Sequence, residues 1–208
     1  TKELVTPNHN RANYQINSDG LKELSQYKML KDLQLNFDDF VRLKKISVEK
    51  GLKFLCTPFD HKSMNFISKK LKLNTVKISS GDIDNIPLIL EASQSFKNII
   101  LSTGASTINI IDKSLQIMEY GYLNKKKLPI EKIVLPEDRV NKSFKNFNKN
   151  IFLLHCTSEY PAPFSDVNLN SIQYLKKRYG LEVGLSDHTN GIHVAIAAVA
   201  KGAKIIEK

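Results

Sequence analysis

The stretch LEVGLSDHTNGIHVAIAAVAKGAKIIEK, residues 181–208, decides the fold. A short apolar run, LEVGL, stops abruptly at Ser186, Asp187 and His188. An apolar helical pattern, IHVAIAAVAKG, follows, and the stretch closes on a second short apolar run, AKIIEK. This order predicts a strand, a polar loop, a helix and a further strand, which is the repeating unit of a parallel β/α sheet.

The same alternation extends over most of the chain. The apolar runs are short and do not alternate strictly with polar residues, which is typical of strands buried on both faces. We predict strands at 53–59, 75–81, 98–104, 150–158, 181–187 and 203–208. We predict helices at 37–51, 60–72, 86–96, 107–121, 166–180 and 191–202. A long basic segment, 122–149, interrupts the pattern, and we interpret it as a solvated surface insertion.

Both a doubly wound sheet and a (β/α)₈ barrel fit this alternation. No G-x-G-x-x-G motif follows any predicted strand, which disfavours a dinucleotide-binding sheet. Small polar or chemically active residues end most of the predicted strands, namely Thr57 with Asp60, Lys77 with Ser80 and Asp82, Ser102 with Thr103, His155 with Ser158 and Glu159, and Ser186 with Asp187 and His188. Because loops from many strands converge at one end of a barrel, this pattern favours an α/β protein with a (β/α)₈ TIM barrel.

Composition restricts the class of partner. The 208 residues carry a net charge of +10, which suits an anionic partner but does not choose between nucleic acid and a phosphorylated metabolite. No recognisable nucleic-acid-binding module is present and no apolar run approaches a membrane span, so we expect neither nucleic acid nor a membrane as partner. A basic protein that binds nucleic acid through 122–149 remains the alternative from a different class. Cys56 and Cys156 end apolar runs, which indicates reduced thiols in a cytoplasmic protein.

Lys77 lies inside the apolar run TVKISSG, so its ammonium group needs an anion. A phosphate or carboxylate ligand is one possibility, and a structural ion pair with Asp60 or Glu159 is the other. We favour the ligand because hydroxyl groups cluster around this position. Ser80, Ser102 and Ser186 precede predicted helices, where they would either cap the helix or help to bind phosphate.

The histidines allow more than one interpretation. His188 follows a strand end, where a histidine is either a metal ligand or a hydrogen-bonded structural residue, and no second ligand at a regular spacing is evident. His155 fits a core histidine with satisfied hydrogen bonds. Cys156 follows it directly, but adjacent strand residues point to opposite faces, so a Cys–His nucleophile pair is disfavoured.

Five motifs in order, TPFD, KISSGDIDNIPLI, ILSTGAS, LLHCTSEYPAPFSDVNLNSI and VGLSDHTNGIHVAIAAVAKGAKIIEK, resemble the sialic acid synthase (N-acetylneuraminate synthase) family, which includes legionaminic and pseudaminic acid synthases. The resemblance covers almost the whole chain except 122–149. It implies a cytoplasmic transferase that condenses phosphoenolpyruvate with N-acetylmannosamine or a related sugar, releases phosphate and serves cell-surface polysaccharide synthesis. It also implies Mn²⁺ or Mg²⁺ as cofactor, and a homodimer when full length.

The resemblance also implies roles for individual residues. It places Thr57, Lys77, Ser80, Ser102 and Ser186 against phosphoenolpyruvate, Ser158 on the phosphate side, Tyr160 and Asp82 against the sugar, and His188 on the metal. Lys77 and Asp82 are the expected catalytic residues. Asp82 stands where the family usually has Glu, which bears on the identity of the sugar. Our own inference adds Asp187 as a residue that orients its neighbours around the metal.

Relative to the family, the chain corresponds to about strands 3 to 8 of the barrel. The second metal histidine of the family would come directly after Lys208. The first two strands, with an acidic catalytic residue and a second lysine, and the C-terminal antifreeze-like domain lie outside the resemblance. We therefore expect residues 1–208 alone to be inactive, and a non-catalytic remnant is a further alternative.

Overall fold

The computed structural model describes residues 5, 6, 10, 25–125, 147 and 149–208. The chain divides into two compact units, Thr1–Phe54 and Leu55–Lys208. No described helix is long and apolar enough to cross a membrane.

The described part of Thr1–Phe54 contains the helices α2 (Gln26–Leu33) and α3 (Phe37–Glu49). Helix α3 begins at a capping box, in which the Asp39 N–H donates to Asn36 Oδ1 at 3.0 Å and the Asn36 N–H donates to Asp39 Oδ2 at 3.1 Å. This reciprocal pair satisfies two backbone donors that a helix N-terminus leaves free. The sequence predicts α3, whereas the short helix α2 is found only in the structure.

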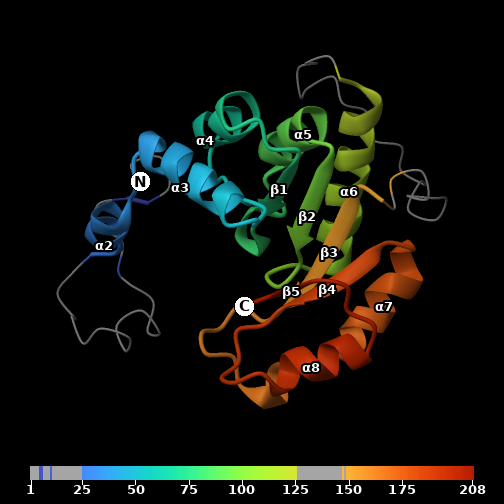
Figure 1. Ribbon diagram of the computed structural model, residues 1–208. Helices are drawn as coiled ribbons and strands as arrows, with labels where there is room; N and C mark the ends of the chain where they lie inside the picture. The colour runs from blue at the N-terminus through green and yellow to red at the C-terminus, as the bar shows by residue number, and fades with distance from the viewer. Residues whose placement is uncertain (1–4, 7–9, 11–24, 126–146, 148) are drawn as a thin grey trace. The chain divides into compact units, whose positions relative to one another are not determined.

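Five parallel strands form the sheet of Leu55–Lys208, and they are β1 (Thr75–Ile78), β2 (Asn98–Ser102), β3 (Ile151–Cys156), β4 (Glu182–Ser186) and β5 (Ile206–Glu207). They lie side by side in chain order, with no reversal (Figure 1). A doubly wound sheet needs a point at which the strand order reverses, so that alternative is wrong for these strands. The predicted incomplete (β/α)₈ barrel is confirmed: the sheet is half a barrel.

The connecting helices follow the predicted positions. They are α4 (His61–Asn65), α5 (Ile86–Ser95), α6 (Ile108–Leu123), α7 (Asn170–Tyr179) and α8 (His193–Ala200), with a π-helix at Phe66–Lys70 and 3₁₀ turns at Ser80–Asp82 and Phe164–Asp166. Helix α5 packs on α4, α6 and β2, while α7 packs on β3 and β4. Helix α7 ends at Gly180, whose φ of 65° is the left-handed conformation that glycine adopts without strain.

One predicted strand is wrong. Residues 53–59 form no strand, and Cys56 makes a single ladder-like bond, from the Lys77 N–H to its carbonyl at 3.2 Å. Leu55 and Phe59 are each 45% exposed, so this run is not buried on both faces as the other strands are. The apolar composition was misleading because it does not show which side chains are covered.

Alternation along the strands separates two faces of the sheet. Val76, Ile78, Ile99, Leu101, Ile151 and Leu153 are fully buried and form the core with side chains of the helices. Burying each such side chain contributes roughly 1.5–3 kcal/mol. Lys77 lies between Val76 and Ile78, so it belongs to the opposite face, where the candidate site is found.

Candidate functional site at the carboxyl ends of the strands

Lys77 forms an ion pair across the open end of the sheet. Its Nζ lies 2.8 Å from Oε1 of Glu207, and the Lys77 side chain is 15% exposed. Lys77 is on β1 and Glu207 is on β5, which are the two outer strands of the five. Four strand spacings in a flat sheet would separate β1 from β5 by roughly 19 Å, too far for these side chains to meet. The contact therefore requires a strongly curved sheet, as in a barrel.

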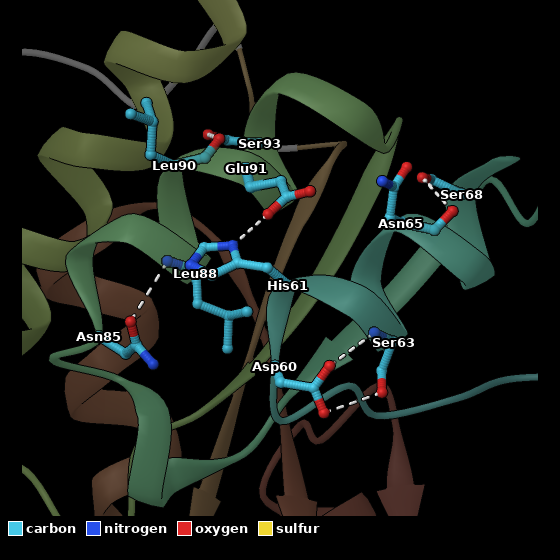
Figure 2. Close-up of polar contacts among 10 residues, drawn as sticks. All are labelled: Asp60, His61, Ser63, Asn65, Ser68, Asn85, Leu88, Leu90, Glu91 and Ser93. Carbon is cyan, nitrogen blue, oxygen red and sulfur yellow. Dashed lines mark hydrogen bonds and ion pairs between the residues drawn. The ribbon is translucent and has the colours of Figure 1, made fainter. Parts of the chain in front are cut away.

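The partner of Lys77 is neither Asp60 nor Glu159, the two candidates for a structural ion pair. Asp60 instead caps its own helix: the Ser63 N–H donates to Asp60 Oδ1 at 2.7 Å and Ser63 Oγ donates to Oδ2 at 3.0 Å (Figure 2). The neighbouring His61 contacts the carboxylate of Glu91 on α5. Glu159 is exposed. Lys77 thus forms a structural ion pair, which was the alternative to a ligand, but with Glu207 rather than Asp60 or Glu159. The motifs gave Glu207 no role.

Register places further polar residues on the same face as Lys77. Lys77 pairs with Ile100, Cys156 with Ser186, and Ser186 with Glu207. Since paired residues of parallel strands share a face, and alternate residues of one strand do too, Ser102 joins this set through Ile100. Thus β1, β2, β3, β4 and β5 each direct a polar or sulfur-bearing side chain to one side at their carboxyl ends.

Two polar atoms on this face have no partner. Ser102 is 2% exposed, and its Oγ has no hydrogen-bond partner among the described residues. The same holds for Oε2 of Glu207. Buried polar groups are almost always hydrogen-bonded, and an orphaned one is costly. A hydroxyl group and a carboxylate oxygen are thus left without partners among the described residues on the face that carries Lys77.

The alternative in which Ser102 and Ser186 act as helix caps is wrong. Thr107, not Ser102 or Thr103, caps α6 by accepting from the Ile110 N–H at 3.4 Å. The Thr103 Oγ donates to the Leu154 carbonyl at 3.0 Å and so ties β2 to β3. Ser186 caps no helix. The hydroxyl group of Ser102 is therefore left without a partner among the described residues, whereas that of Ser186 contacts His188 Nε2 at 3.0 Å.

Cys156 lies within this face. Burial raises the pKa of its thiol, and contacts with Gly104, Ser80 and Lys77 lower it by less. The thiol is free and buried, as is that of Cys56, in agreement with the prediction of reduced thiols. Gly104 approaches so closely that an added Cβ would lie 2.5 Å from Cys156 Sγ. Ser80 and Lys77 are thus brought to the sulfur from β1, and Gly104 from the end of β2.

Ser80 and Asp82 lie on the 3₁₀ turn that follows β1. The Ser79 side chain holds this turn by accepting from the Gly81 N–H at 3.4 Å. Burial raises the pKa of Asp82, a hydrogen bond with Asn85 lowers it, and the Asp84 carboxylate raises it again. The net result is a carboxyl group with a raised pKa at the rim of the strand ends.

His188 is held by three contacts. Its Nδ1 lies 2.7 Å from the Thr157 carbonyl, and its Nε2 lies 3.0 Å from Ser186 Oγ and 2.8 Å from the Tyr160 hydroxyl. A carbonyl can only accept, so Nδ1 bears the proton and Nε2 is left as an acceptor. The rings of Tyr160 and His188 also stack, with centroids 3.8 Å apart. In this neutral tautomer the hydroxyl groups of Ser186 and Tyr160 donate to Nε2, so a metal ion at Nε2 would replace these hydrogen bonds.

The geometry of His188 fits one ligand position of a metal. Metal-bound histidines generally donate their other N–H to a carbonyl or carboxylate, as Nδ1 does here. Among the residues that the structure describes, however, no group of three or more His, Cys, Asp or Glu side chains is placed to hold a metal ion. Among the described residues, His188 is thus a candidate ligand without a complete metal site around it.

Asp187 does not have the orienting role that we expected. Its buried side chain accepts from the N–H and hydroxyl of Thr189, at 2.9 and 2.7 Å, and pairs with Lys208 Nζ at 2.7 Å. Burial raises the pKa of Asp187, but the bonds from Lys208 and Thr189 outweigh burial and leave the pKa below its ordinary value. Asp187 therefore fixes the loop after β4 to Lys208 rather than orienting His188 or Ser186.

The remaining predicted residues lie at the periphery. Thr57 is half-buried in the segment before α4, next to Cys56, whose carbonyl accepts from Lys77. Ser158 is exposed, and its Oγ would lie 3.2 Å from a Cβ at Gly104. His155, on the face opposite Cys156, is not a satisfied core histidine, because its Nε2 is buried without a partner among the described residues.

The basic segment lies almost entirely outside the described residues, so the interpretation of 122–149 stays a prediction. Of its residues, Lys125 donates to the Ser93 carbonyl at 2.8 Å, and Tyr122 stacks on Phe147 with ring centroids 5.1 Å apart.

Lys77 and the polar side chains around it lie at the carboxyl ends of the strands of half a (β/α)₈ barrel, which is where active sites lie in barrel proteins. The chain belongs to the NeuB family, whose model matches residues 1–208. It is 37% identical, over 100% of its length and 54% of the relative, to N,N'-diacetyllegionaminic acid synthase of Campylobacter jejuni. It is 27% identical to human N-acetylneuraminate-9-phosphate synthase, over 85% of this chain and 42% of the relative.

A solved structure agrees with this assignment. The N-acetylneuraminic acid (sialic acid) synthetase of Leptospira borgpetersenii, in complex with citrate, matches with a TM-score of 0.70 and 33% identity, over 86% of this chain and 53% of that one. The chain thus spans about half the length of these relatives.

Proposed function

We propose that the protein carrying this chain condenses phosphoenolpyruvate with an N-acetylated aminosugar to give a nonulosonic acid and phosphate. The observation that carries the proposal is Lys77, a nearly buried ammonium group on the face where the Ser102 hydroxyl has no partner. A lysine with hydroxyl donors suits a carboxylate or phosphate. The relatives named above, which are synthases of such acids, and the citrate bound to one of them support an anionic ligand.

The reaction forms one carbon–carbon bond. Carbon 3 of phosphoenolpyruvate adds to the aldehyde carbon of the open-chain sugar, and the aldehyde oxygen takes up a proton. Water adds to carbon 2, and the bond from carbon 2 to the phosphate oxygen then breaks, which releases phosphate. Lys77, Ser80, Ser102 and Ser186 would hold the anionic groups, because fixed donors stabilise the charge that develops.

The second substrate would bind beside His188. Tyr160, at 2.8 Å from Nε2, and Asp82, on the 3₁₀ turn after β1, are the side chains that we assign to the sugar. A divalent ion, Mn²⁺ or Mg²⁺, bound at Nε2 would supply polarisation of the aldehyde. The raised pKa of Asp82 suits a group that exchanges a proton with the substrate.

The identity of the sugar is a separate proposal. N-acetylmannosamine is the general choice for the family, whereas the 37% identity to a legionaminic acid synthase, against 27% for the human enzyme, favours a 6-deoxy diamino analogue. Asp82, with a carboxylate one methylene shorter than the usual Glu, is the residue we expect to bear on this choice.

Phosphate release tests the proposal. The full-length gene product that carries these residues is incubated with phosphoenolpyruvate, Mn²⁺ and either sugar. We expect phosphate and nonulosonic acid in equal amounts with one of the two. Lys77→Met should abolish the reaction, whereas Lys176→Met, which removes an exposed lysine paired with Glu182, should leave it unchanged. Turnover that survives Lys77→Met, or the absence of turnover with both sugars, would contradict the proposal.

A further inference from the structure

Glu207 is the residue of the site to which neither the motifs nor the family resemblance assigns a role. Its Oε1 lies 2.8 Å from Lys77 Nζ, and its Oε2 is buried without a partner among the described residues. Backbone pairing fixes its place, since Glu207 lies opposite Ser186 on β4 and its carbonyl accepts from the Asp187 N–H at 2.8 Å. Backbone pairing therefore fixes Glu207 at the carboxyl end of the sheet, on the outer strand β5.

The charges at this point constrain how an anion can bind. A lysine paired with a carboxylate has no net charge, so an incoming anion meets the repulsion of Glu207 as well as the attraction of Lys77. The Lys77 side chain is 15% exposed and that of Glu207 is 37% exposed, so water screens these interactions only in part. The anion must therefore compete with Glu207 for the same ammonium group.

We propose that Glu207 is a positioning residue that acts as the internal counter-anion of Lys77. In the ligand-free site it holds the ammonium group extended across the open end of the sheet. An anionic substrate takes over the Lys77 ammonium, and the binding equilibrium is an exchange of one carboxylate for another anion. This inference rests on the proposed function, because it assumes that Lys77 binds phosphoenolpyruvate.

The exchange predicts that removing the charge of Glu207 increases the affinity for the anionic substrate, whereas most substitutions in a binding site decrease affinity. Glu207→Gln keeps the size and one acceptor oxygen but removes the charge. The substrate then meets an unopposed lysine, so phosphoenolpyruvate should bind at least about fivefold more tightly. Turnover should change less than affinity, because the bound substrate has already displaced residue 207 from Lys77. The variant should therefore combine a lower KM for phosphoenolpyruvate with a kcat within about twofold of wild type.

Glu182→Gln is the matched control. It also removes a carboxylate paired with a lysine, Lys176 at 3.3 Å, and it lies on β4 at the end away from the site. Glu207→Asp keeps the charge and should bind phosphoenolpyruvate within about twofold of wild type. Circular dichroism of each variant checks that it is folded.

Calorimetric titration of the full-length gene product with phosphoenolpyruvate, and with inorganic phosphate as a second probe, gives the affinities. Tighter binding by Glu207→Gln, with Glu182→Gln unchanged, is the expected result. Unchanged or weaker binding by Glu207→Gln would overturn the counter-anion role, and so would equal tightening by Glu207→Gln and Glu182→Gln. The proposed function stays intact in that case as long as wild type binds phosphoenolpyruvate and Lys77→Met does not. If wild type fails to bind, or Lys77→Met binds equally well, the proposed function itself fails.

Discussion

Gly104 is the position at which backbone packing and the candidate site depend most closely on each other. A Cβ at this position would lie 2.5 Å from Cys156 Sγ, 2.9 Å from the Cys156 carbonyl oxygen and 3.2 Å from Ser158 Oγ. All three distances are shorter than an ordinary contact of about 3.5–4.0 Å between carbon atoms. Since Cys156 is 6% exposed and its backbone belongs to β3, the strand cannot move away freely.

We expect Gly104→Ala to destabilise the fold. Overpacking of this kind costs about 1–3 kcal/mol, and the reduced freedom of the unfolded chain returns about 0.4–1 kcal/mol. The net loss should be about 1–2 kcal/mol in the free energy of unfolding, measured by urea titration. Gly81→Ala is the control, because its Cβ would meet nothing closer than Ser79 Oγ at 3.9 Å. That variant should stay within about 0.5 kcal/mol of wild type.

A double-mutant cycle identifies the clash. Cys156→Ala removes the sulfur atom but leaves the carbonyl oxygen at 2.9 Å, so it should relieve Gly104→Ala only in part. The two substitutions together should cost less than the sum of their separate effects, by about 0.5–1.5 kcal/mol. Strict additivity, or a Gly104→Ala variant as stable as Gly81→Ala, would refute this account of the close approach between β2 and β3.

Three further predictions follow from buried groups. Burial lowers the pKa of His155 from 6.5, so the unfolded chain binds its proton more tightly. The free energy of unfolding should therefore fall as the pH drops below about 6.5, by at most about 1.4 kcal/mol per unit, and urea titrations of His155→Leu should show a flatter dependence. Asp112→Ala should cost about 2–3 kcal/mol, because Asp112 accepts from Arg178 at 2.8 Å and from the Tyr179 hydroxyl at 2.7 Å, whereas Tyr179→Phe should cost about 1 kcal/mol. A smaller loss for Asp112→Ala than for Tyr179→Phe would contradict the first estimate. Burial raises the pKa of Cys56 to about 11, so at pH 8 about a thousandth of it is thiolate, and a thiol reagent should react slowly with the native chain and rapidly in urea.

The fold was predictable where buried strands and helices alternate. Four of the six predicted strands overlap β1 to β4 closely, because each run is apolar on both faces and ends at a cluster of polar residues. The run 203–208 was also placed correctly, although β5 covers only Ile206–Glu207. The run at 53–59 failed because apolar composition alone does not report burial: Leu55 and Phe59 are largely exposed.

The candidate site was predictable in its members but not in their pairing. Strand-end motifs placed Lys77, Ser102 and Ser186 at the carboxyl ends of predicted strands, and the register shows that they share a face. The ion pair between Lys77 and Glu207 was missed because 130 positions separate the two residues and only the curvature of the sheet brings β1 to β5. A carboxylate inside the apolar run AKIIEK was the signal that could have found it, by the same argument that singled out Lys77.

Asp187 shows the opposite error. Its position between Ser186 and His188 suggested a role in orienting them, but successive residues at a strand end point in different directions. Its carboxylate instead meets Lys208 and Thr189. Sequence neighbours are thus a poor guide to contacts at a strand end, whereas register across strands is a good one.

Binding of phosphoenolpyruvate to wild type and to Lys77→Met tests the central claim most directly. Calorimetric titration of the full-length gene product should show one site in wild type and in the surface control Lys176→Met, and none in Lys77→Met. Equal affinity in all three proteins would show that the anion binds away from the carboxyl ends of the strands and would contradict the account.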